Sequence, residues 1–204
     1  MADATVRVEA AGPPAAAPGT AVPRTIVPPA GIPIVVAVLG ALVAAIASNK
    51  LWALDFFHVA GGALWTSVDL FVGFVIGPIL RRMSVQARVE FSSRFMPKMV
   101  LLMPTLVIVT LAAGFQLARY LGNLSSAAPG HAWVVASFIV VGVLTVVAIG
   151  VLEPANLAVL FELRKPHPNG ELIGRLMRRF VFAAGILGAG QVATLVIMTK
   201  LAAG

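Results

Sequence analysis

Apolar residues run along this chain in five long segments, separated by short polar turns and loops. A membrane-spanning helix needs about 20 mostly apolar residues, because each residue advances the helix by about 1.5 Å. The first segment is somewhat short for a span, and the other four are long enough. The pattern predicts an all-α polytopic transmembrane bundle of about five spans, with a four-helix core and one N-terminal span. The segments are 32–48, 51–80, 98–121, 132–161 and 180–201.

The composition supports a chain embedded in lipid. It is 59% hydrophobic and 11% charged, whereas a soluble domain carries about 25% charged residues. There is no cysteine, which excludes disulfides, thiolate metal sites and iron–sulfur clusters. The start of the chain is rich in Ala and Pro and has little to bury. We therefore predict a disordered tail over residues 1–30 and a transmembrane bundle over residues 31–204.

The charged residues indicate how the chain sits in the membrane. Basic side chains gather in two predicted loops, one after the second segment and one after the fourth: Arg81, Arg82, Arg88, Arg94 and Lys98, then Arg164, Lys165, Arg175, Arg178 and Arg179. Such loops face the cytoplasm. We expect a protein of the cytoplasmic membrane of a bacterium, with its N-terminus inside and its C-terminus outside. The net charge of +7 follows this topology and does not indicate nucleic-acid binding.

One face of the second segment carries three ionisable side chains. At about 100° per residue, Asp55, His58, Trp65 and Asp69 fall within an arc of roughly 80°. Ionisable groups cost several kcal/mol in hydrocarbon, so such residues inside a span usually serve a function. The face therefore marks a candidate functional site.

A histidine in this setting is a candidate metal ligand, because neutral imidazole binds haem iron and other metals well. His58 lies near the outer end of the second segment, and His131 lies at the outer end of the fourth. We expect the two to be axial ligands of a b-type haem, with Trp65 as a flat wall for the macrocycle. Asp55, one turn from His58, is expected to accept its second ring N–H. The alternative is a copper site formed by Asp55, His58 and His131, since imidazole and carboxylate suit Cu(II).

Asp69 is too far along the helix to join that site. It lies about 16 Å beyond His58 by the helical rise. In the fourth segment, Glu153 and Asn156 are expected at a similar depth, so we predict that Asp69 pairs with Glu153 or with a basic group from another helix. Two simpler hypotheses stay open. His58 could only hydrogen-bond to a neighbouring helix, and the polar face could bind other membrane subunits or a second copy in a non-catalytic, structural role.

The sequence also resembles a known family. FFHVAGGALW at 56–65, followed by an apolar run to GPILRR at 77–82, resembles the opening of CopD-like membrane proteins, which are similar to HemJ-type protoporphyrinogen oxidases. RFMPKM at 94–99 and TLAAG at 110–114 look like the family's second helix, and the resemblance covers about residues 51–200. It implies haem b with His58 as an axial ligand, while CopD-like members are linked to copper uptake. Thr-Ser replaces the expected Gly-Gly at 66–67, so roles are transferred only to His58 and Trp65.

No motif of a common soluble enzyme class occurs. The chain has no phosphate loop, no HExxH zinc motif and no nucleophile elbow. We therefore favour a cytochrome b-like redox or electron-transfer subunit, without assigning it a reaction of its own.

Overall fold

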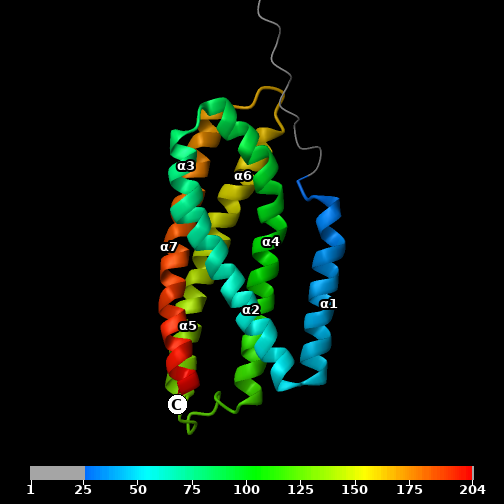
Figure 1. Cartoon of the computed structure of the whole chain (residues 1–204), viewed down its shortest axis with the longest axis vertical. Helices are drawn as coiled ribbons and strands as arrows, with labels where there is room; N and C mark the ends of the chain where they lie inside the picture. The colour runs from blue at the N-terminus through cyan, green and yellow to red at the C-terminus, as the bar shows by residue number, and fades with distance from the viewer. Residues whose placement is uncertain (1–25, 204) are drawn as a thin grey trace, which may run out of the picture.

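A computed structural model of the protein describes residues 26–203, and every element in that part of the chain is helical (Figure 1). The elements are η1 (Pro29–Gly31), α1 (Ile32–Ser48), α2 (Leu51–Leu70), η2 (Phe71–Ile76), α3 (Gly77–Arg82), α4 (Val85–Tyr120), α5 (His131–Val147), η3 (Ala148–Leu152), α6 (Glu153–Leu163) and α7 (Gly170–Ala203). They form five helical rods that are long and apolar enough to cross a membrane. The predicted all-α bundle with five spans is confirmed. Most of the predicted tail, residues 1–30, lies outside the described residues.

The connections between the rods lie at the two ends of the bundle (Figure 1). The α3–α4 turn, the α6–α7 loop and the start of α1 lie at one end, which we call the arginine-rich end. The α1–α2 turn, residues 121–130 and the C-terminal end of α7 lie at the opposite end. Both basic regions of the sequence therefore lie on the same side of the bundle.

The loops at the arginine-rich end are much shorter than the sequence suggested. α4 begins at Val85 and α7 at Gly170, well before their apolar segments. Ser84 caps α4 by accepting a hydrogen bond from Ala87 N (3.2 Å), and Asn169 Oδ1 accepts from the first turn of α7. Such caps start a helix by satisfying free N–H groups. The prediction of loops was wrong here, because hydropathy marks the apolar length of a helix and not its full length.

Two rods contain a π-helical stretch just before a proline. η2 precedes Pro78, and η3 precedes Pro154. Proline has no N–H to donate and its ring collides with the carbonyl four residues earlier. A wider π turn relieves this conflict without ending the helix. The rods α2–η2–α3 and α5–η3–α6 therefore stay continuous and pack along α7.

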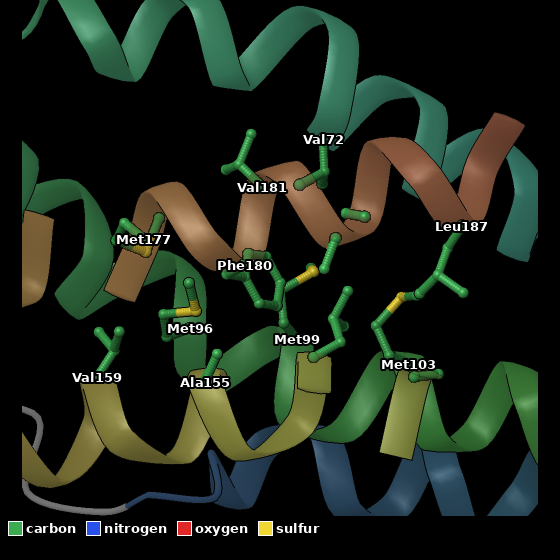
Figure 2. Packing of buried hydrophobic residues seen from close by; sticks show 14 of the residues in the cluster. Val72, Met96, Met99, Met103, Ala155, Val159, Met177, Phe180, Val181 and Leu187 are labelled. Carbon is green, nitrogen blue, oxygen red and sulfur yellow. The ribbon is translucent and has the colours of Figure 1, made fainter. Parts of the chain in front are cut away.

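The main core lies between α4, α6, α7 and the second rod. Phe180 is only 1% exposed and lies among Met96, Met99 and Met177 (Figure 2). α1 is peripheral, because only Leu42 and Ala45 are buried in it. This arrangement agrees with the prediction of a four-helix core plus one N-terminal span.

Small residues let the second rod approach α7 closely. A Cβ atom on Gly73 would lie 2.3 Å from Gly185 Cα, and one on Gly188 would lie 2.8 Å from Leu70 N. Contacts of this kind bring helix backbones together in membrane bundles. The α2–α7 register that they set fixes the depth of the buried polar residues described below.

Candidate functional site

His58 lies at the contact between α2 and α4. Its Nδ1 atom is 3.0 Å from the main-chain oxygen of Thr110. A carbonyl oxygen can only accept, so Nδ1 carries the proton and donates it, and Nε2 of the neutral ring keeps a free lone pair. Within residues 26–203, no side chain or main-chain group forms a hydrogen bond with Nε2. The imidazole is thus held by one nitrogen, and the other has no hydrogen-bond partner among the described residues.

Glycines on both helices make this contact possible. A Cβ atom on Gly114 would lie 2.6 Å from Nδ1 and Cε1 of His58, and one on Gly61 would lie 2.8 Å from Thr110 Oγ1. The Thr110 hydroxyl group donates its own hydrogen bond to the main-chain oxygen of Leu106 (2.7 Å). The close approach of α2 and α4 therefore lets the His58 ring reach the main chain of α4.

Asp55 does not take the expected role beside His58. Its side chain is exposed, and the ring N–H of His58 goes to Thr110 instead. The prediction was wrong on this hydrogen bond, because spacing along one helix identifies neighbours on that helix and not the carbonyl groups of the next one. The prediction that Asp55 binds a metal rests on the sequence alone.

His131 is the first residue of α5 and has a similar environment. Its Nδ1 atom lies 3.3 Å from the main-chain oxygen of Asn123, so its Nε2 also keeps a lone pair. The tilted rings of Phe115 and Phe138 have centroids 6.2 Å apart, so these two residues of α4 and α5 lie at a similar depth. His131 precedes Phe138 by seven residues, which places it about 10 Å nearer the end of the bundle. The structure therefore does not bring it to the depth of His58.

No cluster of three metal-binding side chains of the types His, Cys, Asp and Glu forms among the described residues. The copper set of Asp55, His58 and His131 is therefore not gathered in this structure. Its assignment, and that of His131 as a second axial ligand, remain predictions.

Deeper in the bundle, Asp69 pairs with α7. Its carboxylate is 1% exposed and accepts a hydrogen bond from Gln191 Nε2 at 3.0 Å. Trp65 is 3% exposed and lies in the main core. Its indole N–H lies near the Asp69 carboxyl group but does not meet the geometry of a hydrogen bond. Trp65 is thus a core residue that borders a buried polar pair.

The predicted pairing of Asp69 with Glu153 was wrong. A Cβ atom on Gly190 would lie 2.7 Å from Leu144 Cδ2, so Leu144 is at the depth of the Asp69–Gln191 pair. Glu153 follows Leu144 by nine residues, about 13 Å nearer the arginine-rich end. α2 crosses the bundle obliquely (Figure 1), and depths counted from the helix ends ignored that tilt.

Asn156 is fully buried near Glu153, one turn further along α6, and its amide atoms have no hydrogen-bond partner among the described residues. It does not contribute to the Asp69 pair, which lies nearer the opposite end. Gln191 was not predicted, although a polar amide inside the fifth apolar segment is a visible signal. The Thr110 contact uses a main-chain oxygen and leaves no such signal.

Replacing Gln191 with leucine should destabilise the bundle by about 1–3 kcal/mol, because Asp69 would be left buried without its partner. The double variant Asp69→Leu/Gln191→Leu should have a stability closer to that of wild type, because it leaves no buried polar group without its partner. Unfolding in mixed detergent micelles measures both, with Val192→Leu, an exposed neighbour, as the control. A Gln191→Leu protein as stable as that control would contradict the pairing.

Comparisons with protein-family models, with curated proteins and with solved structures found no match for this chain. The resemblance of residues 51–200 to CopD-like and HemJ-type proteins therefore remains a prediction. The geometry around His58 is the observation from which a function can be inferred.

Proposed function

We propose that this protein is a cytochrome b-like membrane subunit that binds haem b through His58 and transfers electrons. The observation that carries the proposal is the anchored imidazole, with Nδ1 bound to the Thr110 carbonyl and Nε2 free. Metal-ligating histidines are usually held in this way, because a hydrogen bond from the other ring nitrogen fixes the tautomer and the ring orientation. A neutral imidazole lone pair is a common axial ligand of haem iron.

A single histidine ligand such as His58 suits a haem better than a metal ion bound by protein side chains alone. A haem takes four of its iron ligands from the macrocycle and needs one or two from the protein, whereas no three-ligand group forms in the described residues. Thr110 would orient the His58 ring and Gly114 would pack against it, so His58 is the ligand that the proposal assigns to the haem. A bound haem would supply one-electron transfer.

We infer from the charge distribution that this site lies near the outer membrane surface. By the positive-inside rule, we infer that the arginine-rich end and the N-terminus face the cytoplasm of a bacterium and that the C-terminus lies outside. His58 lies seven residues into α2, about 10 Å from the outer end of that helix. The loops are short, so electron donors and acceptors would be other membrane subunits, a second copy, or carriers dissolved in the bilayer.

His58→Ala should abolish haem binding. In protein purified from haem-replete cells, haem content should fall to about a tenth of wild type or less. Removing the ligand itself costs more than the roughly 10–100-fold loss caused by changing a hydrogen-bond partner of a ligand. His167→Ala is the matched control, because His167 is exposed in the α6–α7 loop. Haem is measured as its pyridine complex, and copper is measured on the same sample.

Equal haem content in wild type and His58→Ala would contradict the proposal. Copper without haem, lost in His58→Ala, would instead support the copper site. Unchanged metal content with loss of a co-purifying subunit would support the structural role.

A further inference from the structure

A cavity of about 350 Å³ opens at the arginine-rich end, between α3, the start of α4 and α7. Four of its lining residues are arginines: Arg81, Arg88, Arg178 and Arg179. The other lining residues are glycine or apolar and include Leu80, Met177, Val181 and Phe182. Among the described residues, no carboxylate lines this cavity. Four cationic side chains therefore line a cavity whose other lining residues are glycine or apolar.

Arg88 is fixed in place by the main chain. Its Nε atom donates to the carbonyl oxygen of Leu80 (3.2 Å), and Nη2 donates to that of Met83 (3.1 Å). A Cβ atom on Gly174 would lie 2.6 Å from Nη1, so the glycine leaves room for the guanidinium group. Main-chain carbonyls orient this cation without neutralising its charge.

Two acidic residues at this end, Glu90 and Glu162, pair with other cations, and Glu171 does not line the cavity. Within residues 26–203, the ion pairs are Arg94–Glu90 and Lys165–Glu162, and neither involves an arginine of the cavity. The positive-inside rule explains an excess of arginine at this end. It does not explain why four of them line one cavity, with Arg88 partly buried there.

The chemistry of the cavity matches a phosphate group with an apolar tail. Guanidinium groups bind phosphate oxygens through paired, charge-assisted hydrogen bonds. The apolar side of the cavity continues to Phe182, which is 67% exposed on the side of α7. A haem propionate is too distant, because Arg81 follows His58 by 23 residues, more than about 30 Å along the rod.

We propose that this cavity binds the phosphate head group of an anionic phospholipid, with the acyl chains lying along the apolar surface around Phe182. Basic pockets between helices at the cytoplasmic surface bind anionic lipid head groups in this way. The site is separate from His58, and its test does not depend on haem.

Two double variants that remove the same charge test the proposal. Arg178→Gln/Arg179→Gln changes the cavity, and Arg164→Gln/Arg175→Gln changes exposed residues at the same end that do not line it. Native mass spectrometry of the full-length protein, titrated with phosphatidylglycerol, gives the apparent Kd. The Kd should rise about tenfold in the cavity variant and less than about twofold in the control. Phosphatidylcholine should bind wild type about tenfold more weakly.

Gly174→Ala tests the same site without changing its charge. The added methyl group would displace the Arg88 guanidinium and should weaken phosphatidylglycerol binding about threefold or more. If the cavity double variant does not fold, Gly174→Ala tests the lipid-binding proposal on its own. Equal weakening by both double variants, or equal binding of the two lipids, would overturn the proposal. Inorganic phosphate that binds as tightly as phosphatidylglycerol would also overturn it, by showing that the occupant is a free anion.

Discussion

Replacing Gly73 with alanine is expected to destabilise the protein strongly, because the added methyl group has no space. The new Cβ atom would lie 2.3 Å from Gly185 Cα and 2.7 Å from Gly185 N. Both neighbours are main-chain atoms, so no side-chain rotation can relieve the collision and the second rod must move away from α7. Overpacking of this kind costs about 1–3 kcal/mol. The shift would also disturb the Asp69–Gln191 pair, one turn away.

Thermal unfolding in detergent measures the effect of Gly73→Ala. Gly142→Ala is the matched control, because a Cβ atom on Gly142 in α5 would meet nothing within 4 Å. Alanine is also the better helix former, so the control should be as stable as wild type or slightly more stable. Equal unfolding temperatures for the two variants would show that the η2–α7 contact is not as close as described.

Gly114→Ala is expected to weaken haem binding about 10–100-fold, a loss typical of changes to the partner of a metal-binding histidine. This prediction rests on the proposed function. The new Cβ atom would lie 2.6 Å from Nδ1 of His58 and would push the ring away from the Thr110 carbonyl. The His58 imidazole would still be present, but its orientation would no longer be fixed.

Titration of haem-depleted protein with haem gives the affinity of each variant. Gly62→Ala is the control on the same α2–α4 interface, since its Cβ atom would make an ordinary 3.5 Å contact with Thr110 Cγ2. It should bind haem as wild type does. If Gly114→Ala and Gly62→Ala bind haem equally well, the anchoring of His58 does not govern its affinity.

The fold was largely predictable because lipid imposes a simple requirement on the sequence. Each span needs a long apolar segment, and the five segments became the five rods. The helical extensions at Val85 and Gly170 were missed, because they are polar and begin at the caps Ser84 and Asn169. Their positions depend on local hydrogen bonding, which hydropathy does not record.

The site was predictable only in part. The sequence singled out His58 and Asp69 as costly groups in a span, and the structure gives each a specific partner. The partners were not foreseen. Thr110 uses its main-chain oxygen, which every residue has, and the depth of Gln191 depends on the tilt of α2. Partners on other helices follow from tertiary packing, and the pattern along one segment does not contain them.

The most direct test of the central claim is a reduced-minus-oxidised absorption spectrum of the wild-type protein, with iron and copper measured on the same sample. A haem bound through His58 predicts a Soret band that shifts on reduction, a sharp band in the visible region, and iron in about equimolar amount to the protein. Protein from haem-replete cells that is colourless, or that carries copper and no Soret band, would contradict the proposed function.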